Sequence, residues 1–173
     1  SHENYKIKSS TQWLPLLSLP RMLNINPDNT LESTPYIKTS TEHIEFWKQK
    51  LSSEGKPIVG INWQGNPKIE LGNLKGRSLK LTEFEEFSKN KKIRLLSLQK
   101  GFGSEQFQEC SFKNSFVSCQ DLVNDTWDIS STLGIISNCD LVITSDTMTA
   151  HICGAIGKPT WLLLHKVPDW RWG

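Results

Sequence analysis

Apolar side chains recur with the spacing of an α-helix in several separate stretches of the chain. Between residues 41 and 55, Ile44, Trp47 and Leu51 stand at positions i, i+3 and i+7, and Gly55 follows the last of them. This spacing puts the apolar side chains on one face of a helix, and a glycine beyond its end is a common stop signal. Similar spacing predicts further helices over residues 81–90, 128–138 and 147–157.

Short apolar runs alternate with these helices. They predict β-strands over residues 57–63, 93–99, 140–144 and 159–165, with a shorter strand over 115–118. Strands that are apolar on both faces are typical of a parallel sheet with helices on both sides. Because single helices connect successive strands, we expect right-handed crossovers. The pattern therefore predicts an open α/β sheet, a class of fold that binds ligands at the carboxyl ends of its strands.

Residues 1–40 show neither the spacing of a helix nor the apolar runs of strands. They are rich in Pro, Ser, Thr and Asn, and the strings NINPDNT and ESTPY are typical of turns. We interpret this segment as an extended lead-in from a preceding part of the protein, and residues 41–173 as one domain. A chain of 173 residues is long enough for one domain with a substantial core.

Charge and cysteine content narrow the classes of function. The formal net charge is +2, too small to indicate binding to nucleic acid or to an anionic membrane. We find no secretory signal and no run near the roughly 20 apolar residues of a membrane span. The cysteines lack the close spacing of a zinc site, and Cys139 and Cys153 lie in apolar surroundings that suit packing. These features favour a cytoplasmic protein.

A dense group of hydroxyl and acidic side chains stands where the third main strand turns into the last helix. The group consists of Thr144, Ser145, Asp146, Thr147 and Thr149. The first turn of a helix has unpaired N–H groups and a partial positive charge, so it suits a phosphate. His151 is four residues after Thr147 and shares its helix face. Ordinary capping of the helix by these side chains is the alternative interpretation.

Two further loops are expected at the same edge of the sheet. The loop over 65–81 is rich in glycine and basic residues, and Arg77 in it suits phosphate recognition. The alternative is an ordinary surface loop whose basic side chains face solvent. The loop over 97–106 carries Lys100 and Glu105, and Glu105 either accepts hydrogen bonds from a nucleoside or faces solvent. Neither GxGxxG nor GxxxxGK[ST] occurs in the chain. Three such loops together indicate a nucleotide site.

These segments in combination resemble a known family. The chain resembles the C-terminal domain of glycosyltransferase family 9, the heptosyltransferase-like family. The resemblance is carried by the strings VGINWQGNP, GRSLKL, SLQKG, CDLVITSDTMTAHICGAIGKPTWLLL and PDWRW. The version appended to tetratricopeptide-repeat (TPR) proteins is the more similar one, and the resemblance covers about residues 13–172. It implies a Rossmann-like open parallel sheet with helices on both faces, the C-terminal half of a GT-B fold.

The resemblance implies an activity as well. Members of the family transfer a sugar from a nucleotide diphosphate sugar, typically ADP-heptose, with inversion at the anomeric carbon. The domain would bind this donor, and the acceptor would be a glycan, a lipid or a protein. No metal or other cofactor is expected, because N–H groups, hydroxyls and basic side chains that are already in place can stabilise the leaving diphosphate.

The resemblance also assigns residues. The family's diphosphate-binding turn matches Asp146, Thr147, Met148, Thr149 and His151, and Ser145 stands directly before it. Many heptosyltransferases have glycine at the position of Met148, which lets the backbone approach a phosphate more closely. Arg77 matches a basic position that faces the diphosphate, and Lys100 would be a second clamp. Glu105 aligns loosely with a glutamate that contacts the nucleoside.

The family places the general base in its N-terminal half, so no catalytic base is assigned here. Relatives continue beyond DWRWG into a helical tail, and we interpret the chain as a fragment that is inactive without the rest of its protein. Trp170 and Trp172 either stack on a base or pack against a neighbouring element.

Two other functions are consistent with the same residues. The first is a non-catalytic module of a repeat protein that binds a nucleotide sugar or another protein. The second is a GT-B sugar-nucleotide epimerase, which would release free sugar and nucleotide without an acceptor.

Overall fold

The computed structural model describes residues 12–26, 28, 34–71, 75–169 and 172. The chain divides into two compact units, Ser1–Ser33 and Thr34–Gly173, so the boundary comes before the one expected at residue 40. In the first unit, a 3-10 turn over Leu16–Ser18 leads into α1 (Leu19–Met22). This segment was expected to be extended but contains a short helix. Pro20 lies in the first turn of this helix, where a proline is well tolerated.

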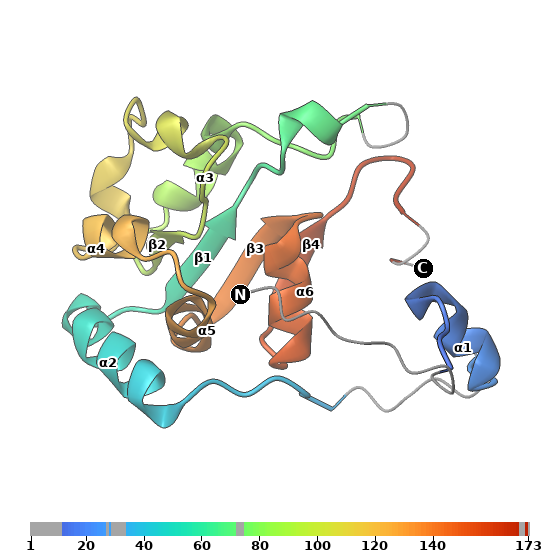
Figure 1. Ribbon diagram of the computed structural model, residues 1–173. Helices are drawn as coiled ribbons and strands as arrows, with labels where there is room; N and C mark the ends of the chain where they lie inside the picture. Colours follow the sequence, from blue (N-terminus) through green and yellow to red (C-terminus); the bar gives the residue numbers. More distant parts are fainter. Residues whose placement is uncertain (1–11, 27, 29–33, 72–74, 170–171, 173) are drawn as a thin grey trace. The chain divides into compact units, whose positions relative to one another are not determined.

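The described part of the second unit is built on a four-stranded parallel sheet with the order β2-β1-β3-β4 (Figure 1). Its strands are β1 (Ile58–Asn62), β2 (Arg94–Ser97), β3 (Leu141–Ser145) and β4 (Thr160–Leu163). The main strands predicted from the sequence are all confirmed. After β2 the chain crosses to the other side of β1, so the strand order reverses between β1 and β3. Such a reversal opens a crevice at the carboxyl ends of these two strands.

Helices connect and cover the strands. They are α2 (Thr41–Leu51), α3 (Glu85–Ser88), α4 (Gln120–Asp125), α5 (Ile129–Ser137) and α6 (Met148–Ala155). The helices predicted over 41–55, 128–138 and 147–157 are confirmed, and the one over 81–90 is a 3-10 turn followed by the short α3. No helix in the described ranges is long and apolar enough to cross a membrane.

The segment before α5 differs from the prediction in two ways. Residues 115–118 do not form a strand, because Phe116 makes an isolated bridge to Leu95 and the ladder goes no further. The helix α4 was not predicted, since QDLVND is too short to show a helical period.

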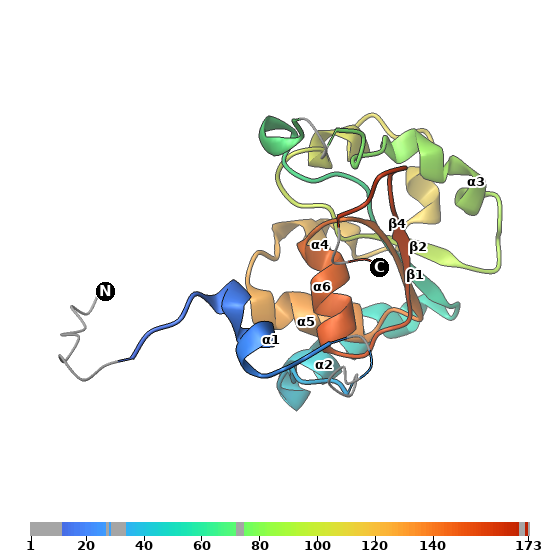
Figure 2. The same ribbon diagram turned by 90° about the vertical axis from the view of Figure 1, so that its right-hand side faces the viewer.

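Both faces of the sheet are covered, as the apolar strands require. Side chains of β1 alternate between two apolar clusters: Ile58 joins the one formed with α2, α5 and α6, while Val59 and Ile61 join the one beside α3. Figure 2 shows α2, α5 and α6 on one side of the sheet and α3 on the other. Cys139 is buried in the first cluster, and burial raises the pKa of its thiol to about 12, in line with a packing role.

The helices α2 and α5 pack closely at Gly134. A Cβ atom there would lie 2.8 Å from the carbonyl oxygen of His43 and 2.9 Å from Cδ1 of Trp47. We expect Gly134→Ala to lower the free energy of unfolding by about 2 kcal/mol in urea denaturation, because overpacking a core costs about 1–3 kcal/mol. Gly154→Ala is the matched control: no atom of the described ranges lies within 4 Å of its Cβ position, so the helix-favouring alanine should be neutral or stabilising. Equal effects of both changes would contradict this packing.

Candidate functional site

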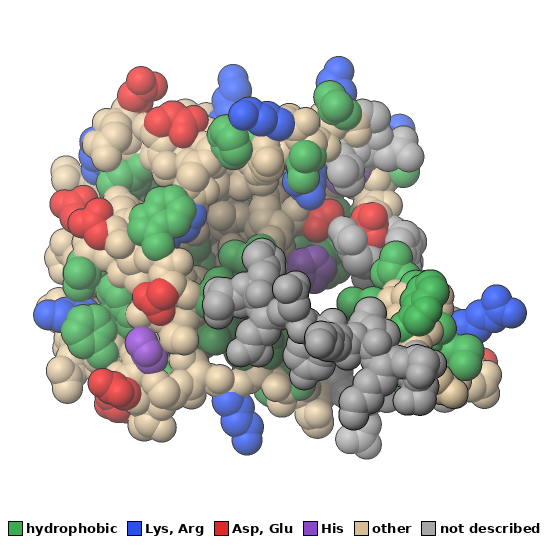
Figure 3. Space-filling view, viewed as in Figure 1, with side chains coloured by type: hydrophobic (Ala, Val, Ile, Leu, Met, Phe, Trp, Pro, Cys, Tyr) green, Lys and Arg blue, Asp and Glu red, His purple; other side chains and the backbone are tan. Residues whose placement is uncertain are grey.

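A cavity of about 630 Å³ lies at the carboxyl ends of β1, β2 and β3. Its lining comes from the ends of β1 and β2 and the loops that follow them, from the turn after β3, from α6, and from the start of α5 with the segment before it. The space-filling view shows the hollow with charged side chains of both signs and a histidine at its border (Figure 3). The cavity therefore occupies the crevice that the strand order creates.

The N-terminus of α6 forms part of the cavity wall and has no side-chain cap. The N-cap residue is Thr147, in extended conformation, and its hydroxyl donates to Oδ1 of Asn62 at 2.8 Å instead of capping the helix. Asp146 is 2% exposed, and its Oδ2 has no hydrogen-bond partner among the residues that the structure describes. Neither side chain caps the helix, which removes the capping interpretation of this cluster. The N–H group of Ala150 donates to the carbonyl oxygen of Thr147 at 3.1 Å. Within the described part of the chain, the N–H groups of Met148 and Thr149 at the start of the helix remain available to a ligand.

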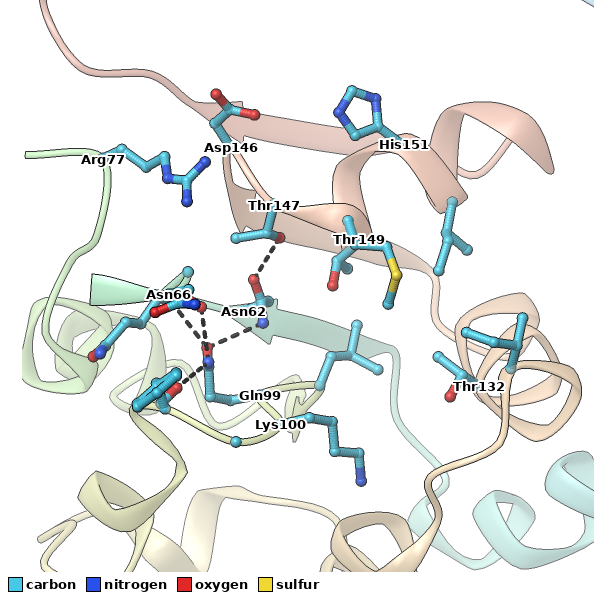
Figure 4. A pocket seen from close by; sticks show the side chains of 18 of the residues that line it. Asn62, Asn66, Arg77, Gln99, Lys100, Thr132, Asp146, Thr147, Thr149 and His151 are labelled. Atoms are coloured by element: carbon cyan, nitrogen blue, oxygen red, sulfur yellow. Dashed lines mark hydrogen bonds between the residues drawn. The ribbon is translucent and has the colours of Figure 1, made fainter. Parts of the chain in front are cut away.

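Arg77 comes from the loop after β1 and points towards the turn that carries Asp146 and Thr147 (Figure 4). Its Nε lies 3.6 Å from Oε1 of Glu70, and both side chains are 11% exposed. The guanidinium packs over Gly65, where a Cβ atom would lie 2.7 Å from Nη2. The structure thus holds Arg77 in place at the cavity wall.

The same loop is braced by Ser78. Its backbone N–H donates to Oε2 of Glu70 at 3.3 Å, and its hydroxyl hydrogen-bonds to Oε1. The hydroxyl also accepts a hydrogen bond of 3.0 Å from the N–H of Gly65. Glu70 and Ser78 therefore fix both the loop and the guanidinium that it presents.

Lys100 lines the cavity, but α4 holds its ammonium group. Nζ donates to the carbonyl oxygen of Asn124 at 2.9 Å and to that of Val123, at the helix end that attracts cations. It also lies 5.8 Å from the centre of the Trp127 ring. Burial lowers the pKa of Lys100 to about 8, against the opposing effect of Asp125. The ammonium points away from Thr147 (Figure 4), so this structure does not place it beside Arg77 as a second clamp.

The depressed pKa of Lys100 predicts a pH dependence of stability. The lysine pKa is 10.5 when unperturbed and about 8 in the folded chain, so unfolding takes up a proton between these values. Stability due to this group therefore rises as the pH increases from about 8 to 10.5. We expect the wild type to gain about 1 kcal/mol relative to Lys100→Met across this window, a value reduced for solvent screening of a half-exposed group. Urea titrations at both pH values measure it, and parallel behaviour of the two proteins would contradict it.

His151 lines the cavity from α6, one turn behind Thr147. The indole ring of Trp172 stacks on its imidazole, with ring centres 4.9 Å apart and planes 20° apart. Of the two interpretations of the C-terminal tryptophans, packing on a neighbouring element thus describes Trp172, while Trp170 lies outside the described residues. The stack restricts rotation of the imidazole at the cavity wall.

The remaining predicted residues divide into two groups. Met148 and Thr149 line the cavity, and Met148, at the position where many heptosyltransferases have glycine, is largely exposed. Ser145 is fully buried, its hydroxyl has no hydrogen-bond partner among the described residues, and it is not part of the lining. Glu105 lies on an exposed 3-10 turn and does not line the cavity either.

A buried glutamine that the sequence analysis did not assign ties the loops together. Oε1 of Gln99 accepts hydrogen bonds from Asn62 Nδ2 at 3.0 Å, from Trp63 N–H at 3.1 Å and from Gln64 N–H at 2.9 Å. Its Nε2 donates to the carbonyl oxygens of Gln64 at 2.8 Å and Phe102 at 2.6 Å. Gln99 is 3% exposed, so these bonds are made away from bulk water.

Asn62 extends this hub to the turn after β3 through its bond to Thr147 (Figure 4). The sequence does carry a signal for both amides. Each is the last residue of an apolar run, IVGIN or LLSLQ. Side chains at such positions are often buried, and buried polar atoms must be paired. Within the described ranges, no three His, Cys, Asp or Glu side chains gather where a metal ion could bind.

No protein-family model matches the chain, and no curated protein sequence is similar to it. Among solved structures, the chain is similar to ADP-heptose LPS heptosyltransferase II of E. coli, with a TM-score of 0.56 and 16% sequence identity. At this identity the likeness is one of fold: both chains contain an open parallel sheet of the Rossmann-like α/β type. The match covers 79% of this chain and 41% of that chain, so the chain spans less than half of the enzyme's length. The Rossmann-like α/β fold expected from the sequence is confirmed, and the activity has to be inferred from the site.

Proposed function

We propose that the unit Thr34–Gly173 is the donor-binding domain of an inverting glycosyltransferase and holds a nucleotide diphosphate sugar in the cavity. The observation that supports this best is the uncapped N-terminus of α6, with Arg77 pointing towards it from the loop after β1 (Figure 4). An anion between them would meet backbone N–H groups, a helix dipole and a guanidinium.

In this proposal the diphosphate lies at the first turn of α6. The N–H groups of that turn and the hydroxyl of Thr149 donate to its oxygens, Arg77 balances its charge, and His151 orients or protonates one oxygen. These donors are in place before the reaction, so they stabilise the charge that develops on the leaving diphosphate. The base that deprotonates the acceptor is proposed to come from another part of the protein.

Part of the cavity lining suits a nucleoside. Besides its polar groups, the lining contains apolar and aromatic side chains: Leu98, Phe102, Trp127, Ile129 and Ile152. An apolar wall with a few placed polar groups is the usual form of a small-molecule site, and aromatic side chains bind the faces of bases. The cavity thus offers both apolar surface for a nucleoside and polar groups for its phosphates.

Thermal unfolding with a panel of ligands tests the proposal. We would compare ADP, UDP, GDP, ADP-glucose, UDP-glucose and GDP-mannose with inorganic pyrophosphate and the nucleosides. A ligand at 100 times its Kd stabilises the folded state by about 2.7 kcal/mol, which raises the Tm of a chain of this size by about 5–10 °C. No shift with any nucleotide, up to millimolar concentration, would refute the proposed donor site.

Activity separates the proposed transferase from a binding module. The protein would be incubated with the donor that stabilises it and with glycan, lipid and protein acceptors, and the anomeric configuration of the product would be read by NMR. An inverted glycoside supports the proposal, and free sugar formed without an acceptor would indicate the epimerase. Binding without turnover by the full-length protein would instead favour a non-catalytic module.

A further inference from the structure

Backbone groups fix the orientation of the Gln99 amide. The N–H groups of Trp63 and Gln64 can only donate, and both point to the same side-chain atom of Gln99, so that atom is the oxygen Oε1. The nitrogen Nε2 points to the carbonyl oxygens of Gln64 and Phe102, which can only accept. Turning the amide over would oppose all of these bonds at once.

This orientation determines that of Asn62. Because Oε1 of Gln99 is an acceptor, the Asn62 atom that lies 3.0 Å from it must be the donor Nδ2. The other atom, Oδ1, therefore faces the hydroxyl of Thr147 at 2.8 Å and can only accept. A hydroxyl group has a single proton, and Thr147 gives it to Asn62. Only the lone pairs of this oxygen remain for a ligand in the cavity.

The neighbouring Thr144 leaves this assignment in place. Its hydroxyl is fully buried and donates to the carbonyl oxygen of Ser145 at 2.9 Å. It lies farther from Asn62 Oδ1, at 3.3 Å, and 3.2 Å from the hydroxyl of Thr147. Thr147 is thus the nearer donor to Asn62.

We infer that Thr147 accepts a hydrogen bond from a sugar hydroxyl of the donor and does not hold its diphosphate, and that Gln99 and Asn62 are the positioning residues that set this polarity. The inference rests on the proposed function. Phosphate oxygens carry negative charge and need donors, whereas a sugar hydroxyl has a proton to give. The role expected for Thr147 from the sequence, a donor to phosphate, is thereby revised.

Asp146 supports the same division of the site. Asp146 is 2% exposed and lines the cavity, and its Oδ2 has no partner in the described part of the chain, so it too requires a donor from a ligand. Two successive side chains of the turn after β3 therefore present acceptors. The helix N–H groups, Thr149 and Arg77 present donors, which leaves the diphosphate to them.

Paired titrations of a nucleoside diphosphate and its sugar-linked form test the inference. Calorimetry would use whichever pair the wild type binds: UDP and UDP-glucose, ADP and ADP-glucose, or GDP and GDP-mannose. In Thr147→Val, which keeps the branched shape without the hydroxyl, we expect the Kd of the sugar nucleotide to rise about tenfold. The Kd of the nucleoside diphosphate should change less than twofold, and Thr147→Ser should restore the wild-type ratio.

Asn62→Leu tests the positioning role. Without the Asn62 oxygen, the proton of Thr147 is free to rotate and can be donated to a diphosphate oxygen, so the nucleoside diphosphate should bind more tightly and the preference for the sugar nucleotide should fall. Adding Thr147→Val to this variant should abolish the gain for the nucleoside diphosphate, because it removes that proton. Should Asn62→Leu fail to fold, the Val and Ser variants of Thr147 decide alone. Equal weakening of both ligands by Thr147→Val would overturn the inference while the proposed function stands. Absence of binding by the wild type would refute both.

Discussion

Gln99→Met is expected to lower the free energy of unfolding by about 4 kcal/mol. The substitution keeps the length of the side chain and removes its polar atoms, so the N–H groups of Trp63 and Gln64 and the carbonyl of Phe102 lose their partner. Each buried polar group left without a hydrogen bond costs about 1–3 kcal/mol. Urea unfolding followed by tryptophan fluorescence would show the loss as a lower midpoint at an unchanged slope.

Gln108→Met is the matched control for this experiment. Gln108 undergoes the same chemical change but is exposed, and its side chain makes no hydrogen bond within the described part of the chain. Its substitution should change stability by no more than about 0.5 kcal/mol. A similarly small loss for Gln99→Met would mean that water from the cavity replaces the amide, and Gln99 would not be the hub described above.

Arg77→Met should weaken binding of the nucleoside diphosphate about 100-fold. The guanidinium is 11% exposed at the cavity wall, and truncating one partner of a desolvated charge pair costs about 2–5 kcal/mol. Binding of the parent nucleoside, which has no phosphate, should change little. Calorimetry with the nucleotide that stabilises the wild type most would measure the difference.

Lys75→Met is the control for the loss of positive charge. Lys75 lies in the same loop, is exposed and does not line the cavity, so a loss of less than about threefold is expected from screened long-range attraction. If both variants weaken binding equally, the net charge of the loop matters and the placement of Arg77 does not. If the nucleoside loses as much affinity as the diphosphate, Arg77 contacts another part of the ligand.

The order of strands and helices could be predicted because burial leaves a period in the sequence. Ile44, Trp47 and Leu51 mark α2 in this way, and Trp47 and Leu51 are indeed buried. The helix α4 is too short to show a period, so it was missed. Phe116 reads as part of a strand because it is apolar, yet its burial comes from ring contacts with Phe107 and Phe112 and not from a ladder.

The sequence was enough to locate the candidate site, but the hydrogen bonds within the site could not be predicted from it. The parallel fold brings Arg77, Thr147 and His151 to one cavity, as expected. Pairings such as Gln99 with Asn62 or Lys100 with the end of α4 join residues distant in sequence. No local pattern specifies them, because the same side chains at the same positions are equally compatible with facing solvent. The partner of each polar group became evident only in the folded chain.

The brace formed by Glu70 and Ser78 bears on how fast and how tightly an anion is captured. An arginine that swings freely in water loses roughly 2 kcal/mol of rotational entropy when a ligand immobilises it. In this protein the rotational entropy of Arg77 is already lost on folding, since the ion pair with Glu70 and the contact with Gly65 restrain the side chain. Association can then proceed without waiting for a rearrangement, and rigid recognition favours a long residence time for a partner whose shape matches it.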